Sequence, residues 1–453
     1  MTETTAVAAP LRILDEMPQG GSRLGWNLIG VLTGLIGVAA LAAWILSSYF
    51  RIDVAGSMSF HGADGWCSAP PDGLGIHCWG DYSAIRFNSL TAPPQGAEIV
   101  YPLSTRLIRA PFMLLEGIAG FQAGLLAFII ASALAVLAPA AWAVRKVQWP
   151  LKPVVVTASC VVTMPFLVLF DRANIIALAV PFVFLFLLAL VRERPWLAVA
   201  CLVVASSIKP QFIVLGLALV TLRHWRPAVV GLIGSGAAIV LPFLLMGNGW
   251  LSALTTWMDQ SRAWSASQPL AADWPPNLSI AKVLFESLQF FVIQPDSYFV
   301  GLTLVFTLAI CVVIAVTGRH LHPLLVGTVF LTIACLAMPI SYAYYSFFAI
   351  PILALVFRLG FTPSAFPSRW DTPITALLSA GLVVTLSPIL IPVGILGPAQ
   401  LDGQSLASSL TPRLSSVIWT LFLVASAILS IANWRSQVRP GMHVPELVDD
   451  ERH

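Results

Sequence analysis

Long apolar stretches alternate with short polar connections along most of the chain. Many of these stretches approach the roughly 20 residues that a helix needs to cross the hydrocarbon core of a bilayer. Because no water is present there to satisfy backbone polar groups, we expect each stretch to be helical. The alternating segments of about ten residues that a transmembrane β-barrel would need are not seen in the sequence. The pattern therefore predicts an all-α, polytopic bundle of transmembrane helices.

The spacing predicts about twelve spans. The first runs from Trp26 to Ser48 and is long enough to remain as a membrane helix rather than be cleaved as a signal. The others are expected at residues 122–144, 153–170, 175–191, 196–208, 211–222, 228–246, 298–318, 324–338, 344–357, 372–395 and 413–433. The two segments that flank Lys209 and Pro210 are short, so they are either two half-length helices or one long helix.

Basic residues in the short connections indicate the orientation, because cytoplasmic loops carry an excess of Lys and Arg. If the chain turns back near Lys209, one face receives 15 of the 24 basic residues. These are Arg12, Arg23, Arg145, Lys146, Lys152, Arg192, Arg194, Arg223, Arg226, Arg319, Arg358, Arg369, Arg435, Arg439 and Arg452. This face is predicted to be cytoplasmic, which favours two half-length helices and places the tails 1–25 and 434–453 in the cytoplasm.

The opposite, extracytoplasmic face receives the longest polar connections. Two are large loops, at residues 49–121 and 247–297, and a third lies at 396–412. Polar residues at membrane depth are costly and are often functional. We therefore interpret the chain as a single integral domain of the cell membrane, residues 1–453, with its functional site on the external face.

The composition agrees with this class of protein. Hydrophobic residues make up 58% of the chain and charged residues 10%, which is not the balance of a water-soluble domain. The net charge of +3 gives no electrostatic support for a nucleic-acid partner. Membrane lipids are the expected surroundings.

Two of the six cysteines, Cys67 and Cys78, lie in the first external loop. An oxidising compartment favours a disulfide between them, whereas a metal site that includes His61 or His77 would follow no known spacing. The other four lie in apolar spans and are expected to be small buried hydrophobic residues.

Residues 101–120 are predicted to form an amphipathic helix that lies in the membrane interface. Apolar residues recur at helical spacing, with Arg106, Arg109 and Glu116 between them. The alternative is a simple turn that leads into the second span.

Several polar residues need an explanation at membrane depth. Lys209 interrupts an apolar stretch beside a proline, and an unpaired ammonium group there costs a few kcal/mol, so an anionic ligand is expected. The alternative is that its side chain reaches the lipid headgroups. Asp171, Arg172 and Asn174 form a tight turn that either lines a polar cavity or caps helix ends. Loop 247–297 contains several aromatic residues, and Tyr342, Tyr344 and Tyr345 lie close together later in the chain. One interpretation is that these side chains bind a sugar or a prenyl chain. The alternative is that they belong to the aromatic belt at the membrane interface.

Four segments together resemble glycosyltransferase family 87 of the GT-C superfamily, which includes polyprenyl-phosphomannose-dependent mannosyltransferases. They are Gly80-Asp81-Tyr82 with Tyr101-Pro102, Asn174 followed by Ile208-Lys209-Pro210, Asn277-Leu278-Ser279-Ile280, and Pro339-Ile340-Ser341-Tyr342. The chain departs from the family pattern at Leu103, where a second proline is common, and at Tyr344 and Tyr345, where histidines occur.

The resemblance implies a GT-C-type fold and an inverting transfer of a hexosyl residue. Mannose is the first candidate for this sugar. The donor would be a polyprenyl-phosphate sugar, and the acceptor a lipid-linked or cell-envelope glycan on the external face. An external carboxylate would deprotonate the acceptor hydroxyl, while membrane-level cations would stabilise the departing phosphate. No cofactor is expected, and no metal, because no Asp-x-Asp pair is present.

We assign the expected roles as follows. The base is Asp81, with Asp53, just after the first span, as the second choice. The donor phosphate is bound by Lys209 and Arg172. The remaining substrate contacts are expected from Tyr82, Asp171, Asn174, Gln211, Asn277, Ser279, Tyr342 and Tyr345.

A transporter or flippase of a lipid-linked saccharide is the main alternative. Transporters usually show internal repeats and charged residues in mid-span, and the sequence shows neither clearly. A purely structural membrane subunit would leave Lys209 and Asp81 without a role.

Overall fold

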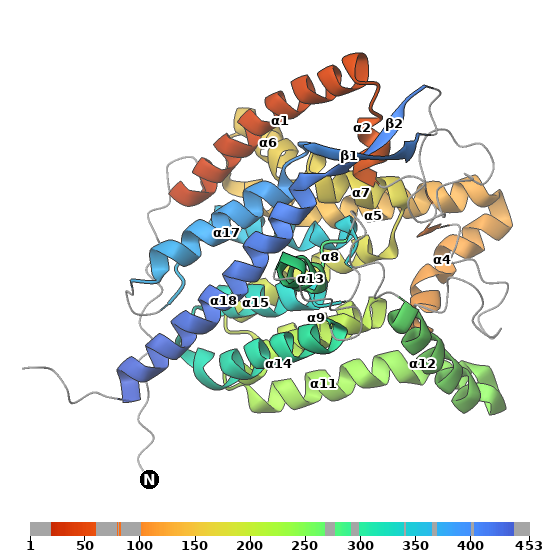
Figure 1. Cartoon of the computed structure of the whole chain (residues 1–453). Coiled ribbons are helices and arrows are strands. Elements are labelled where there is room, and N and C mark those ends of the chain that lie inside the picture. The colour runs from red at the N-terminus through yellow and green to blue at the C-terminus, as the bar shows by residue number, and fades with distance from the viewer. Residues whose placement is uncertain are drawn as a thin grey trace, which may run out of the picture.

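The computed structural model describes residues 20–59, 79, 81–82, 101–267, 277–290, 299–338, 341–364, 369–399 and 403–438. Over these ranges the chain forms a bundle of helices with one two-stranded sheet (Figure 1). The bundle has two distinct ends. Helix α1 (Arg23–Tyr49) begins and α18 (Leu410–Val438) ends at one of them, while α4 (Ser104–Ala119) and α12 (Trp250–Ser267) lie at the other (Figure 1).

Among the described residues, five helices are long and apolar enough to cross a membrane. They are α1, α5 (Phe121–Ala143), α11 (Trp225–Val240), α14 (Phe299–Thr317) and α18. A bent pair, Trp149–Val161 with Met164–Arg172, would make a sixth. The predicted all-α membrane bundle is thereby confirmed, while the count of about twelve spans stays a prediction.

The remaining apolar helices are shorter, at 10 to 17 residues. Three begin with a 3-10 segment and continue as α-helix. They are Ile175–Ala179 with α8 (Val180–Val191), Pro210–Leu215 with α10 (Gly216–Thr221), and Ala343–Phe348 with α16 (Ala349–Leu359). The other three are α9 (Pro195–Ile208), α15 (Pro323–Leu336) and α17 (Asp371–Leu386).

The chain turns back at Lys209, as the basic residues predicted. Lys209 has an extended backbone that ends α9, and the following 3-10 segment packs against α9. One long helix through this region is therefore excluded.

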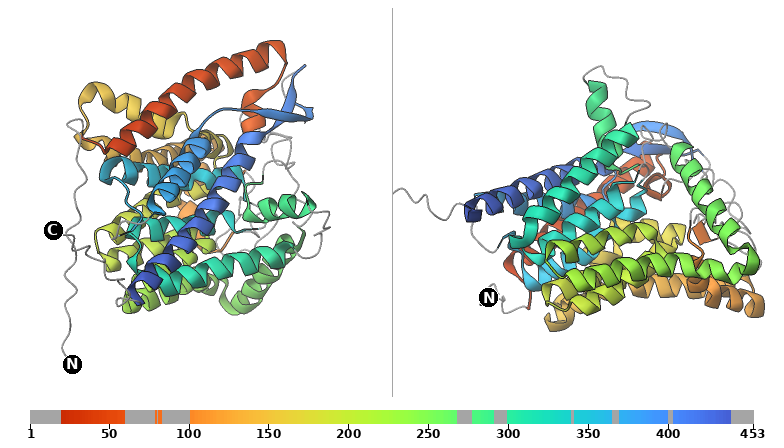
Figure 2. Two further views of the ribbon diagram at one scale, coloured as in Figure 1. Left: turned by 60° about the vertical axis from the view of Figure 1, so that its left-hand side comes forward. Right: turned by 90° about the horizontal axis from the view of Figure 1, so that it is seen from below.

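Three of the short helices, α8, α15 and α16, are largely buried inside the bundle, and long helices lie on its outside (Figure 2). All of Leu324–Leu336 in α15 is buried, as is most of α8. The long helices instead expose large apolar side chains, such as Leu41 in α1 and Leu304 in α14. A helix that is apolar on every side can be shorter than the bilayer when protein rather than lipid covers it.

Helix α4 forms where the amphipathic pattern predicted it. Its two arginines, Arg106 and Arg109, are buried, whereas Leu114 and Ile118 are 67% and 75% exposed. Its polar face therefore points into the protein and its apolar face outward, which suits a helix whose outer side meets lipid.

Two predicted spans were partly wrong. The span at 372–395 ends as helix at Leu386, and the chain continues into strand β1 (Pro392–Pro398), which pairs antiparallel with β2 (Ser405–Ser409). Pro388 and Pro392 explain this, because a proline cannot donate a backbone hydrogen bond inside a helix. The span at 153–170 is interrupted by a π-helical segment, Thr157–Val161, and bends by 63° before α7 (Met164–Arg172).

The orientation can be tested with single cysteines. Glu193 and Arg262 are both exposed, and the predicted topology places them on opposite sides of the membrane. In a background with Cys67 and Cys78 changed to serine, a membrane-impermeant maleimide should label Arg262→Cys in intact cells. It should label Glu193→Cys only after permeabilisation, and the reverse pattern would contradict the assigned orientation.

Candidate active site

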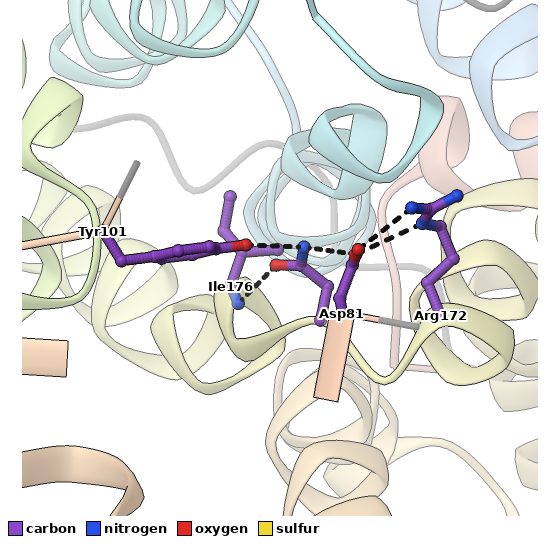
Figure 3. Close-up of polar contacts among 5 residues, drawn as sticks. Asp81, Tyr101, Arg172 and Ile176 are labelled. Atoms are coloured by element: carbon purple, nitrogen blue, oxygen red, sulfur yellow. Dashed lines mark hydrogen bonds and ion pairs between the residues drawn. The ribbon is translucent and has the colours of Figure 1, made fainter. Parts of the chain in front are cut away.

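An ion pair between Asp81 and Arg172 forms the centre of a cluster of polar contacts (Figure 3). The Arg172 Nη2 donates to Asp81 Oδ1 at 2.9 Å, and its Nε donates to Oδ2 at 3.2 Å. Both side chains are only 4% exposed. A planar guanidinium group that meets a carboxylate with two parallel hydrogen bonds fixes the orientation of both partners.

Asn174 extends the cluster in two directions. Helix α7 ends at Ala173 in a left-handed conformation, with φ of 51°, and this turn brings Asn174 to the start of the next helix. Its Oδ1 accepts from the Ile176 amide at 2.9 Å and so caps that helix. Its Nδ2 donates to Asp81 Oδ2 at 2.7 Å and to the Tyr101 hydroxyl at 3.3 Å (Figure 3).

Tyr101 connects this cluster to Lys209. The Lys209 Nζ lies 3.7 Å from the centroid of the Tyr101 ring and 5.9 Å from that of Tyr345, distances typical of cation–π contacts. Lys209 is buried, and no carboxylate lies within salt-bridge distance of it in the described part of the chain. Burial, and after it the charge of Asp81, raise the pKa of the Tyr101 phenol well above its usual value, so the hydroxyl stays protonated.

The start of α4 is bound to the Lys209 turn. Ser104 Oγ donates to the carbonyl of Ser207 at 2.6 Å, and Thr105 Oγ1 donates to that of Ile208 at 3.4 Å. The last carbonyls of a helix have no partner within the helix. The two hydroxyl groups therefore supply hydrogen bonds to the carbonyl groups at the end of α9, and they hold α4 against this helix.

Tyr82 is held by α4 and so helps to fix its neighbour, Asp81. The Arg109 guanidinium stacks 4.1 Å from the ring centroid of Tyr82 and donates to its carbonyl oxygen. The Tyr82 hydroxyl donates to Glu116. These contacts point to a positioning role, and the predicted contact of Tyr82 with substrate stays a prediction.

Asn277 and Ser279 lie where two chain segments join. Asn277 Oδ1 accepts from the amides of Ser279 and Ser341, both at 2.9 Å, and Ser279 Oγ accepts from the amide of Lys282 at 3.2 Å. Both side chains are fully buried. They hold the segment before α13 (Ile280–Phe290) beside the residues that lead to Tyr342.

The tyrosines after Ser341 stack on one another near Lys209. The rings of Tyr342 and Tyr344 are parallel within 18°, with centroids 5.3 Å apart, and Tyr344 contacts Tyr345 at 4.8 Å. Gln211 donates to the Ala334 carbonyl at 3.0 Å and so connects the Lys209 turn to α15.

Asp53 lies outside this cluster, directly before α2 (Val54–Ser59), which packs against α7. Its Oδ1 accepts from the Gly56 amide at 2.9 Å and caps α2.

Asp171 is buried, and its backbone carbonyl accepts from the Trp79 amide at 2.8 Å. The predicted disulfide between Cys67 and Cys78 falls outside the described residues.

The cluster contains several of the predicted site residues. Direct contacts, some of them made through Tyr101, connect five of these residues: Asp81, Arg172, Asn174, Lys209 and Tyr345. The connecting role of Tyr101 was missed, although its Tyr-Pro motif was a signal. Within the described ranges, no three metal-binding side chains come together.

The sequence model of glycosyltransferase family 87 matches residues 99–339, which is more than half of the 453-residue chain. The chain belongs to glycosyltransferase family 87. It is therefore an enzyme, a membrane glycosyltransferase, rather than a transporter. Neither the comparison with curated proteins nor that with solved structures found a match.

The buried ion pair should contribute strongly to stability. Asp81→Asn leaves the Arg172 charge buried without its carboxylate, and losing one partner of such a pair costs about 3–5 kcal/mol. The midpoint of thermal unfolding in detergent should fall clearly. The matched control is Asp259→Asn. Asp259 pairs with Arg262, and both side chains are 73% exposed, so losing this pair should change the unfolding midpoint little. Equal midpoints for the two variants would contradict the assigned role of the pair.

Proposed function

We propose that this family 87 enzyme transfers a hexosyl residue from a polyprenyl-phosphate donor to a lipid-linked or cell-envelope glycan. Mannose is the first candidate for the transferred sugar. The reaction takes place on the extracytoplasmic face of the cell membrane. The observation that carries the proposal is Lys209, a buried ammonium group without a carboxylate partner among the described residues.

An anionic ligand explains this cation better than a structural role does. Cation–π contacts hold the ammonium group but leave its positive charge uncompensated. A phosphate group supplies that charge and can accept hydrogen bonds from all three ammonium protons. The Tyr101 hydroxyl accepts from Asn174, so its own proton remains for a ligand oxygen.

The proposed reaction is a single displacement with inversion. An acceptor hydroxyl attacks the anomeric carbon while the bond from that carbon to the phosphate oxygen breaks. The base takes the hydroxyl proton, and polyprenyl phosphate leaves with the bonding electrons. Lys209 stabilises the charge that develops on the phosphate, with Arg172 as the second predicted cation.

The contacts favour Asp53 over Asp81 as the base. Both Asp81 oxygens accept hydrogen bonds from Arg172, and one also accepts from Asn174, so this carboxylate is already engaged by protein donors. Asp53 Oδ2 has no hydrogen-bond partner among the described residues. We therefore give Asp81 the role of orienting Arg172.

The sugar is expected beside the stacked tyrosines. Tyr342 is half-buried at the start of its helix, and aromatic faces pack well against the apolar faces of sugar rings. Gln211, Asn174 and Asp171 are further predicted polar contacts. The choice of mannose comes from the family resemblance.

The test is turnover of polyprenyl-phosphate sugars by the purified enzyme, measured as release of free polyprenyl phosphate. Asp53→Asn removes the proton acceptor and should lower kcat by about 10²–10⁴-fold. Lys209→Ala removes a charge that stabilises the leaving phosphate and should lower kcat by about 10²–10³-fold. The exposed Asp259→Asn variant is the control and should keep wild-type turnover.

The outcomes separate the parts of the proposal. Full activity of Asp53→Asn would reject Asp53 as base and return Asp81 to that role. Full activity of Lys209→Ala would reject the phosphate site. Failure of the wild-type enzyme to consume any polyprenyl-phosphate sugar would reject the donor class.

Tyr101 gives a second, graded prediction. Tyr101→Phe keeps the ring beneath Lys209 but loses the hydroxyl, so kcat/KM should fall about tenfold, as expected for one hydrogen bond. Tyr101→Leu also loses the cation–π contact, which is worth about 0.5–2 kcal/mol, and should fall further. Equal effects of the two variants would show that the ring does not support Lys209.

A further inference from the structure

Strand β1 is apolar and exposed over most of its length. Val393, Ile395 and Leu396 in the strand are 49%, 64% and 38% exposed, and Ile391 directly before it is 41% exposed. The sequence carries no charged residue from position 372 to position 401. Among the described residues β1 pairs only with β2, so its other edge has no partner strand.

Such a strand is poorly suited to water. Soluble proteins protect sheet edges with charged side chains, above all lysine, or cover them with another element. Here neither protection is present in the described residues. The exposed apolar side chains instead match the surface of a segment that meets lipid.

The strand pair lies at the external end of a membrane span. Ser405 of β2 donates its amide to the Arg51 carbonyl at 2.8 Å and accepts from the Asp53 amide at 3.0 Å. These residues directly follow α1, one of the long apolar helices, and Figure 1 shows the sheet beside the C-terminal part of α1.

The last turns of α1 expose aromatic residues on this side. Trp44, Tyr49 and Phe50 are 57%, 70% and 66% exposed, and the rings of Trp44 and Tyr49 contact each other at 5.7 Å. Tryptophan and tyrosine are enriched where membrane helices meet the headgroups. The exposed apolar surface of α1 therefore extends to its last turn, directly before the residues that are bonded to β2.

We propose that β1 lies in the external lipid interface and forms a membrane contact that continues the lipid-facing surface of α1. Its depth is set by its backbone. An open strand edge cannot lie in the hydrocarbon core, because its amides would have no partner, but headgroups and water can satisfy it at the interface.

A second copy of the chain is a less suitable partner for this edge. The pairing of β1 with β2 is irregular at two places, between Pro392 and Gly394 and between Ile395 and Gly397. Such bulges bend and twist a strand, which disfavours a long regular pairing with another edge. Lipid requires no such register.

The contact would stabilise the loop that bears Asp53. The backbone amide of Asp53 is bonded to β2, and the amide of Ala407 in β2 is bonded to Ser57 Oγ in α2 at 2.9 Å. Seating β1 in the interface therefore fixes α2 relative to the membrane surface. This inference does not depend on the identity of the donor or the base.

The test is spin labelling of Ile395→Cys in the full-length protein, in phosphatidylcholine liposomes, with Cys67 and Cys78 changed to serine. Collisions with oxygen, which concentrates in lipid, are compared with collisions with a water-soluble nickel chelate. Two controls bracket the result. Leu304→Cys lies on the exposed surface of α14, and Arg262→Cys on the exposed surface of α12.

We expect the oxygen-to-nickel ratio at position 395 to be several-fold above that at position 262 and closer to that at position 304. A ratio equal to that at 262 would place β1 in water and overturn the proposal. Low collision with both reagents would mean that protein covers the strand, which also overturns it. Val393→Cys repeats the measurement if Ile395→Cys fails to fold, and a dipolar distance between labels on two copies would identify a dimer.

Discussion

The polar cluster of this enzyme depends on one buried ion pair, between Asp81 and Arg172. Two charges can remain buried only when each compensates the other and further hydrogen bonds satisfy the remaining atoms. Arg172 ends α7, while Asp81 belongs to a part of the chain 91 positions earlier, so the pair joins that segment to the bundle. Asn174 then connects the pair to Tyr101, and the ring of Tyr101 supports Lys209.

The lengths of the helices explain why polar residues can gather at this depth. The short helices α8, α15 and α16 are largely buried, while the long helices expose large apolar side chains on the outside of the bundle. Irregular backbone is tolerated at membrane depth only when protein or water covers it. The turn at Lys209 meets this condition, because hydroxyl groups of α4 satisfy the carbonyls at the end of α9.

The sequence predicted the helices well wherever apolar length and basic loops determined them. It also predicted that Lys209, Arg172 and Asn174 would share one end of the bundle. It failed at residues 387–396, where apolar composition indicated a span but two prolines direct the chain into a strand. Hydropathy measures the preference for lipid, and this segment shows that an apolar stretch can be exposed without being helical.

The pairing within the site could not be read from the sequence. Asp81 and Arg172 are 91 positions apart, and nothing local indicates that the predicted base is held by a predicted phosphate ligand. Asn277 stays a predicted substrate contact, and the sequence did not indicate that its amide oxygen also joins two backbone segments. In both cases the chemistry of the side chain was visible in the sequence, whereas its use depended on long-range contacts.

The central claim is that Lys209 binds the phosphate of a polyprenyl-phosphate donor at the external end of the bundle. An experimental structure with bound polyprenyl phosphate tests it most directly. The account predicts phosphate density within salt-bridge distance of Lys209 Nζ, beside Tyr101, with the prenyl chain leading into apolar surroundings. Phosphate density at the cytoplasmic end, or at the external end without contact to Lys209, would contradict it.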